Sequence, residues 1–172
     1  MKSFVFPLLL LLAINLKAQP ITFEKSYGDN RALVVHQTAD SGYIFAGTTI
    51  TDLVRTNQFG DTLWTKKYPF TINDLQPTSD SGYIIAADSG RVAKIDLLGN
   101  IQWQNTFSNN FLSAIPTADG GYIATGFFTD SSQVDIVLTK IYANGNLQWT
   151  ATHGDPGFNE TATTIIQTAD GG

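Results

Sequence analysis

The carboxylates are the side chains of this chain that could do chemistry, and they fall into two sets. One set repeats within the phrase Thr-Ala/Ser-Asp-Ser/Gly-Gly, and its members are Asp40, Asp80, Asp119 and Asp170. The other set does not repeat and consists of Asp130, Asp155 and Glu160. Carboxylate oxygens are preferred calcium ligands. A metal-binding or catalytic group breaks the symmetry of a repeat, whereas a turn former obeys it. We therefore interpret the first set as structural and keep the second as candidate calcium ligands, with no other cofactor expected.

The two histidines do not indicate a catalytic or zinc site. The chain has no cysteine, so neither a zinc cluster nor a Cys/His nucleophile with the usual spacing can be assembled. His153 stands four positions after a tryptophan, at the place that Tyr68 and Phe107 hold elsewhere, and we interpret it as a packing ring. His36, on a strand edge, is expected to be solvated or hydrogen-bonded. We predict no catalytic residue.

The elements that position these residues come from a compound repeat. The aspartate phrase begins at Thr38, Thr78, Thr117 and, cut short, Thr168. A second phrase, Gly-Asp/Asn-X-X-Trp, ends at the structural tryptophans Trp64, Trp103 and Trp149. Successive aspartates are spaced by 40, 39 and 51, and successive tryptophans by 39 and 46. Periods near this length with several short strands are typical of propeller blades.

Each repeat predicts four strands. The run after each aspartate phrase, such as residues 43–47, is apolar and typical of a buried strand. The strand that carries each tryptophan alternates apolar and polar residues, which indicates a half-buried outer strand. Two further strands precede the two phrases. We predict an all-β, β-propeller-like array of four-stranded antiparallel blades at about 29–69, 70–109 and 110–154, with an incomplete fourth at 155–172. Residues 21–28 match the end of a blade, because Phe23 and Tyr27 align with Trp64 and Tyr68.

The turns have a predicted chemistry. Each repeated aspartate is expected to bond the backbone two positions further on, with Gly42, Gly82 and Gly121 supplying a left-handed conformation. Gly60, Gly99 and Gly145 are expected to do the same in the second hairpin. A basic residue five positions before each of these, namely Arg55, Lys94 or Lys140, is interpreted as a recurring surface ion pair.

The N-terminal segment 1–18 resembles a secretory signal. Lys2 precedes an apolar run that ends at Leu16, and Ala18 is small enough for the cleavage edge. The run is too short to span a membrane, and an anchor helix is the less favoured alternative. The mature region, 19–172, keeps 8 of the 10 basic residues and all 15 acidic ones, a net charge of 8 − 15 = −7. This balance argues against nucleic-acid binding. We expect a protein that is secreted or held at a bacterial cell surface, with no membrane span after cleavage.

The segment from Lys94 to Trp103, Lys-Ile-Asp-Leu-Leu-Gly-Asn-Ile-Gln-Trp, resembles the tryptophan-docking blades of quinoprotein-like β-propellers. Together with the aspartate phrase, the unit is similar to repeat arrays of large secreted bacterial proteins, many of which are exported by the type IX pathway. The likeness covers about residues 22–172. It implies an interaction or scaffold module, continued by further blades beyond Gly172. The alternative that it leaves open is a fragment of a quinoprotein-like enzyme with a quinone cofactor.

Function is expected where the repeats differ. The spacing from aspartate to glycine is 145 − 119 = 26 in the third repeat against 20 and 19 before, and the next spacing, to Asp170, is 25 against 20 and 20. Both enlarged connections, Phe127–Gln133 and His153–Thr161, have the same parity in a meander and should lie on one face. The candidate binding residues there are Phe127, Phe128, Asp130, Asp155, Phe158 and Glu160. We predict a protein or glycan partner on this face, with neutral loop drift as the alternative.

Overall fold

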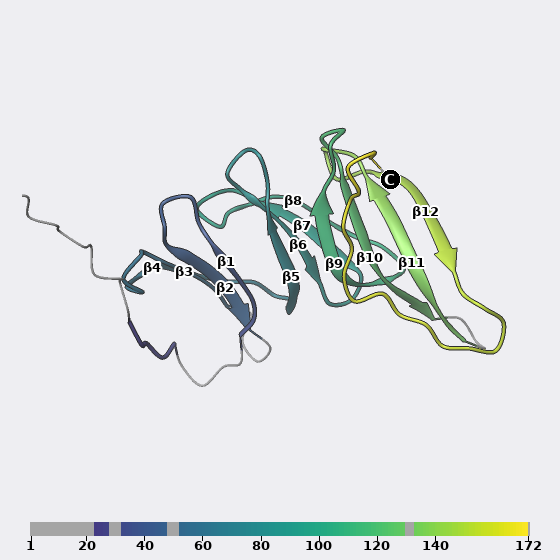
Figure 1. The fold of residues 1–172 in the computed structure, drawn as a ribbon, viewed down its shortest axis with the longest axis horizontal. Coiled ribbons are helices and arrows are strands. Elements are labelled where there is room, and N and C mark those ends of the chain that lie inside the picture. Colours follow the sequence, from purple (N-terminus) through teal and green to yellow (C-terminus); the bar gives the residue numbers. More distant parts are fainter. Residues whose placement is uncertain (1–22, 28–31, 48–51, 130–132, 172) are drawn as a thin grey trace, which may run out of the picture.

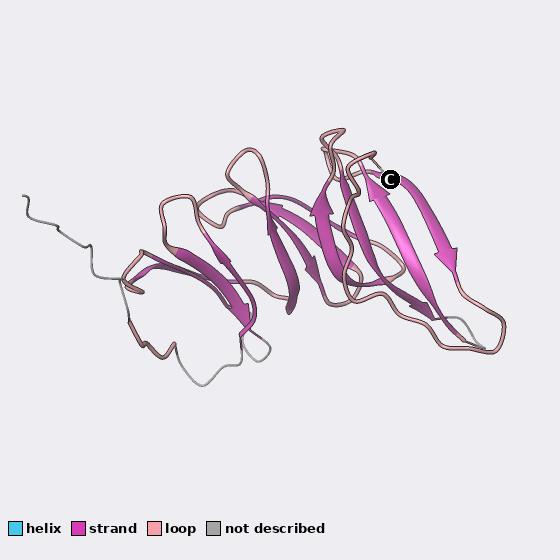
Figure 2. Cartoon of the chain, in the orientation of Figure 1, coloured by secondary structure: helices cyan, strands magenta, loops and turns pink. Residues whose placement is uncertain are grey.

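The computed structural model describes residues 23–27, 32–47, 52–129 and 133–171. The regular structure of these residues is β-strand throughout (Figure 2). The predicted signal segment 1–18 and the candidate Asp130 lie outside the described residues. In the part of the chain that is described, there is no helix long and apolar enough to cross a membrane.

Twelve strands form three antiparallel sheets of four, each a simple meander. The first sheet contains β1 (Ala32–Gln37), β2 (Tyr43–Gly47), β3 (Asp52–Thr56) and β4 (Thr62–Lys67). The second contains β5 (Ile72–Pro77), β6 (Tyr83–Ala87), β7 (Arg91–Ile95) and β8 (Ile101–Thr106). The third contains β9 (Asn110–Pro116), β10 (Tyr122–Thr129), β11 (Val134–Ile141) and β12 (Leu147–His153). The predicted all-β array of four-stranded antiparallel blades is confirmed.

The three sheets follow one another along the long axis of the molecule, each facing the next (Figure 1). One apolar core fills the space between the first and second sheets, with Leu53, Phe70 and Ile85 among its buried members. A second core, which includes Phe111 and Val137, lies between the second and third sheets. Every residue of β6 is buried because the central sheet is covered on both faces. The prediction of a strand buried on both faces is thus confirmed for β6 and is wrong for β2, where only alternate residues are buried because β2 belongs to the first sheet.

The first strands of neighbouring sheets approach each other. The carboxylate of Asp74 in β5 accepts hydrogen bonds from the Ser113 hydroxyl, at 2.7 Å, and from the Ala114 amide, at 3.3 Å, both in β9. The Asn73 amide group donates to the Phe111 carbonyl at 2.8 Å. Polar contacts therefore join β5 to β9, in addition to the apolar cores between the sheets.

Two outer strands, β4 and β8, each place an aromatic ring against a glycine turn of the next sheet. Trp64 in β4 lies over Gly99, where an added Cβ would be 3.1 Å from the ring, and Trp103 in β8 lies over Gly145, at 2.7 Å. Gly99 and Gly145 have φ of +76° and +88°, as the sequence predicted, so the absence of a side chain serves both the turn and the ring.

Residues 23–27 repeat this contact on the first sheet, as the alignment with Trp64 and Tyr68 predicted. The ring of Phe23 lies against Gly60, and the Tyr27 hydroxyl donates to the Gly60 carbonyl at 2.6 Å. The Tyr68 hydroxyl makes the same bond to the Gly99 carbonyl at 2.7 Å. The segment thus occupies, on the first sheet, the position that an outer strand occupies on the later ones.

Candidate functional site

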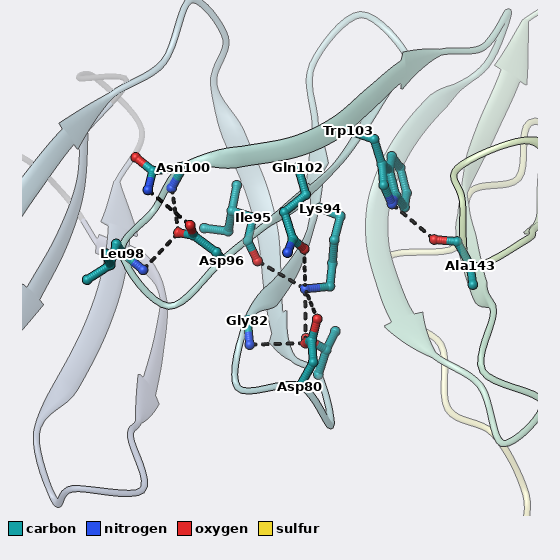
Figure 3. Close-up of polar contacts among 11 residues, drawn as sticks. Asp80, Gly82, Lys94, Ile95, Asp96, Leu98, Asn100, Gln102, Trp103 and Ala143 are labelled. Carbon is teal, nitrogen blue, oxygen red and sulfur yellow. Dashed lines mark hydrogen bonds and ion pairs between the residues drawn. The ribbon is translucent and has the colours of Figure 1, made fainter.

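The repeated aspartates sit in a small polar cluster that Figure 3 shows for the second sheet. The Thr78 hydroxyl donates to Asp80 at 2.5 Å, and the Gly82 amide donates to the same oxygen at 3.1 Å. The Lys94 ammonium, from β7, donates to Asp80 at 3.0 Å. Its remaining bonds, both 3.0 Å, reach the Ile95 carbonyl and the Gln102 side chain. The aspartate therefore closes its own turn and anchors a cation from the third strand.

The same arrangement recurs in the other two sheets. Asp40 accepts from the Gly42 amide at 3.4 Å and pairs with Arg55 at 2.9 Å. Asp119 accepts from the Gly121 amide at 3.1 Å and pairs with Lys140 at 2.8 Å. The predicted aspartate bond to the backbone two positions on is therefore present in all three complete turns.

The surface position predicted for the cations is wrong. Arg55, Lys94 and Lys140 are 8, 3 and 8% exposed, whereas the aspartate side chains with which they pair are about half exposed. The long aliphatic stems cross the covered part of each sheet and bring the charge to its rim. The aspartate thus supplies a counter-charge to a cation that is largely withdrawn from water.

The predicted reason for the glycines of the aspartate turn is also wrong. The left-handed residue is one position earlier, at Ser41, Ser81 and Gly120, with φ of +64°, +67° and +82°. Gly42 and Gly82 are needed instead for close approach, because a Cβ would stand 2.2 Å from the Thr56 carbonyl oxygen and 2.3 Å from the Ile95 one. Such backbone atoms cannot move aside.

These contacts hold the aspartates ionised. Hydrogen bonds from the Thr78 hydroxyl and then from Lys94 lower the pKa of Asp80 to about 2. The Lys140 ammonium, followed by the Thr117 hydroxyl, keeps the pKa of Asp119 well below its usual value. A carboxyl held in its charged form by its own turn suits a structural role and not general acid catalysis at neutral pH.

The start of β11 and the connection after β12 lie side by side at one end of the third sheet, at the lower right of Figure 1. The Glu160 amide donates to the Val134 carbonyl at 2.7 Å, and the Val134 amide donates to the Asn159 side chain at 2.9 Å. The Gly157 amide donates to the Gln133 side chain at 3.1 Å. The connection after β12 is therefore fastened to the start of β11.

The candidate residues of this face differ in position. Phe127 and Phe128 belong to β10 and are half-buried, and Phe128 packs against the second core. The enlarged region predicted from Phe127 onward is therefore partly strand, because β10 and β11 pair as far as Thr129 and Val134. Phe158, in contrast, is 66% exposed.

An open hollow of about 340 Å³ lies beside this connection. Its lining includes Ile136, His153, Asp155 and Glu160. The Glu160 carboxylate accepts from the Asp155 amide at 3.0 Å. Within the described ranges, no three His, Asp or Glu side chains gather closely enough to hold a metal ion. Asp155 and Glu160 thus share a hollow, and the third candidate calcium ligand, Asp130, is outside the described residues.

The histidines have different surroundings from those predicted. His153 is exposed at the rim of the hollow and not packed as Tyr68 is. His36, in β1, is half-buried, and its Nε2 is enclosed without a hydrogen-bond partner in the described structure. The residue four positions after a tryptophan is therefore packed only where a following sheet covers it, as at Tyr68 and Phe107.

Comparison with known proteins gives the fold. No family model matches the chain, and no curated protein matches it by sequence. Solved structures do: the WD40 β-propeller domain of Doa1 (TM-score 0.66, 10% identity, covering 81% of this chain and 45% of that one) and a protein of unknown function from Bacteroides caccae (0.60, 13%, 84% and 52%). A third is a streptogramin B lyase (0.55, 13%, 78% and 44%).

The fold is β-propeller-like. At identities of 10 to 13% these likenesses establish architecture and no activity, since one fold can host many functions. The chain spans about half the length of the solved structures that it matches. Its three sheets correspond to propeller-like blades, and the cores between them are contacts between blades.

Proposed function

We propose that this chain belongs to a non-enzymatic β-propeller interaction module that is exported from a bacterium and binds a protein or glycan through the joined connections of the third blade. The observation that carries the proposal is the set of hydrogen bonds that fixes residues 154–160 to the start of β11 and leaves Phe158 exposed. An exposed aromatic residue on a backbone held in place is a typical centre of a binding surface. Asp155 and Glu160 add charge, and with Asp130 they remain the proposed ligands for any calcium.

Everything that repeats in the described residues serves turns and blade contacts, which favours binding over catalysis. The carboxylates of Asp40, Asp80 and Asp119 have lowered pKa values and are paired with cations, and no observation on the described chain favours the quinoprotein-like alternative. The proposed export rests on the signal-like segment 1–18. Expression in a bacterium, followed by sequencing of the N-terminus of the exported protein, should find it beginning at Gln19. A chain that keeps its signal-like segment and stays with the cells contradicts this part.

We propose further blades as a second partner of this chain. Trp149 of β12 is 43% exposed, whereas the equivalent rings of Trp64 and Trp103 lie against the next blade's glycine turn. Residues 168–171 already form the aspartate turn, since the Gly171 amide donates to the Thr168 carbonyl at 2.9 Å, as Gly120 does to Thr117. A blade with a glycine turn would cover Trp149 in the same way.

Photo-crosslinking tests the binding face. A benzoylphenylalanine in place of Phe158 should give a discrete adduct on intact cells of a bacterium that carries the gene. The same group in place of Tyr142, which is 50% exposed at the other end of the third blade, is the matched control and should give none. Trimming residues 154–160 to the length of the preceding connection should abolish the adduct without unfolding the protein. Equal adducts from both positions, or an adduct that survives trimming, refute the proposal.

A further inference from the structure

A second hollow lies between the first and second blades, at the end that carries the aspartate turns. Its volume is about 370 Å³, within the range of small-molecule sites. Thr38, Asp40 and Arg55 of the first blade line one side, and Pro77, Ser81 and Leu97 of the second blade line the other. We call it the inter-blade groove. It is separate from the connections of the third blade.

Arg55 is the member of the cation series that breaks the repeat. The Lys94 ammonium bonds to an aspartate, a carbonyl and Gln102, whereas among the described residues the Arg55 guanidinium bonds to Asp40 alone, at 2.9 Å. The Arg55 side chain is only 10% exposed, and its Nε has no partner among the described residues. Leu63 explains the difference, because it stands directly before Trp64 just as Gln102 stands before Trp103. A leucine cannot accept a hydrogen bond, so the terminal N–H groups that do not bond to Asp40 are spare donors where Arg55 lines the groove, whereas Nε is itself enclosed.

Ser81 adds a second departure at the opposite wall. It holds the left-handed position of its turn at φ +67°, where the third and fourth copies of the phrase have glycine, at Gly120 and Gly171. A non-glycine residue there costs about 1 kcal/mol. Ser41 has the same conformation but does not line the groove. Ser81 is thus a strained residue that lines the groove and carries a hydroxyl group.

The charges and surfaces of the groove define the class of ligand. The pairs Asp40 with Arg55 and Asp80 with Lys94 cancel, so no excess charge selects an anion or a cation. Donors are available from the guanidinium and the serine hydroxyl, and the half-exposed Asp40 carboxylate is an acceptor. Pro77 and Leu97 supply exposed apolar surface. A ligand that satisfies all three features is neutral, rich in hydroxyl groups and apolar on one face.

We propose that the inter-blade groove binds a neutral saccharide of one or two rings. The sugar hydroxyls accept from Arg55 and Ser81 and donate to Asp40, while the C–H face of a ring lies on Pro77 and Leu97. An ionic ligand would be repelled by one partner of the Asp40–Arg55 pair, and a pure hydrocarbon would leave the polar groups of that wall without partners. This site goes beyond the proposed binding face and is independent of it.

The repeat itself supplies the variant that tests the proposal. Arg55→Lys combined with Leu63→Gln copies the network of Lys94 and Gln102 into the first blade, so it should preserve or raise stability while it removes the spare donors. Lys140→Arg is the matched control, because it exchanges the same pair of residue types away from the groove. Ser81→Gly is a second variant, which relieves backbone strain and deletes the hydroxyl.

Amide chemical shifts of the ¹⁵N-labelled protein give the readout. The probes are glucose, galactose, mannose, N-acetylglucosamine, maltose, cellobiose and chitobiose. At least one should shift the amides of Ala39, Asp40, Ser81 and Gly82 to saturation, and the double variant should bind it about tenfold more weakly. Ser81→Gly should weaken it as well, and Lys140→Arg should not.

Several results overturn the proposal. No saturable shift with any of the seven sugars refutes the ligand class. Unchanged affinity in both Arg55→Lys/Leu63→Gln and Ser81→Gly refutes the site, and so do shifts confined to residues 154–160. Because trimming of residues 154–160 leaves the groove intact, sugar binding that survives trimming separates this site from the one on the third blade.

Discussion

The indole ring of Trp103 lies against Gly145 of the following blade so closely that a Cβ on the glycine would be 2.7 Å from two ring carbons. The indole N–H donates to the Ala143 carbonyl at 3.1 Å, and Asn105 donates to the Gly145 carbonyl at 2.6 Å (Figure 3 shows the first of these bonds). One turn thus receives a ring, an indole donor and an amide donor from its neighbour.

Gly145→Ala should destabilise the protein by about 3 kcal/mol, because it combines a left-handed residue with a steric clash against the indole. Gly157→Ala is the matched control. Its φ is +86°, close to the +88° of Gly145, but an added Cβ there meets no atom within 4 Å. The control should cost only about 1 kcal/mol. Urea unfolding of both variants measures the difference, and equal losses would show that the ring contact contributes nothing.

Trp103→Ala should cost about 3 kcal/mol, near the lower end of the range for a buried aromatic residue, because Trp103 packs on the second core and on the ring of Tyr122. Trp149→Ala should cost less than about 1 kcal/mol, since the Trp149 ring has no covering blade in the described structure. Thermal or urea unfolding gives the comparison. Similar losses for the two variants would contradict the stated difference in packing.

Stability should fall as the pH drops from about 4 to 2. The pKa of Asp80 is about 2 in the folded protein against 3.8 for an unperturbed aspartate, so the unfolded chain takes up the proton first. The contribution is complete above the unfolded pKa and is lost as pH falls through the folded one. Because Asp80 is about half exposed, solvent screening limits it to about 1 kcal/mol.

Asp80→Asn tests that contribution. The variant should show a flatter dependence of unfolding free energy on pH in this window, with a remainder from Asp40 and Asp119, whose pKa values are also lowered. Urea titrations at several pH values would reveal it. An unchanged slope in the variant would show that Asp80 is not linked to acid unfolding.

Gly82→Ala should be severe, at about 3 kcal/mol, because the added Cβ would be 2.3 Å from the Ile95 carbonyl oxygen and 2.4 Å from the Lys94 ammonium. Gly120→Ser introduces the residue that Ser41 and Ser81 already have at the same turn position, in open space, and should cost about 1 kcal/mol. If Gly120→Ser proved the more harmful in unfolding experiments, the left-handed position and not the close approach would be the sensitive one.

The sequence was sufficient to predict features that depend on local chemistry. The aspartate turns, the positive φ of Gly99 and Gly145, and the half-buried alternation of β4 and β8 follow from residue type and spacing, whereas β12 is exposed at all positions but Ala151. The burial of Lys94 was not predicted, because the exposure of a side chain depends on the residues that pack around it and not on its own type. The role of Gly82 was misassigned for a related reason: the carbonyl that excludes a side chain belongs to another strand, at Ile95.

The candidate sites were harder to predict. The lengthened interval between Asp119 and Gly145 indicates extra chain but not its form, and part of it extends β10 and β11 beyond the corresponding strands of the other blades. Phe128 consequently pairs with Asp135 across the sheet and is not at a loop tip. The groove had a signal that was overlooked: Arg55 and Leu63 replace the lysine and glutamine of the second and third repeats.

The contact between a ring and a glycine turn also bears on how such arrays change their number of units. Trp64 and Trp103 face equivalent turns, at Gly99 and Gly145, on successive blades. Excision of the interval between the two tryptophans would leave Trp64 on the strand that faces Gly145. The two blades would then still meet through a tryptophan ring that lies against a glycine turn. Unequal recombination between repeats can therefore add or remove a blade in one step, because the joint between units is the same on both sides of the cut.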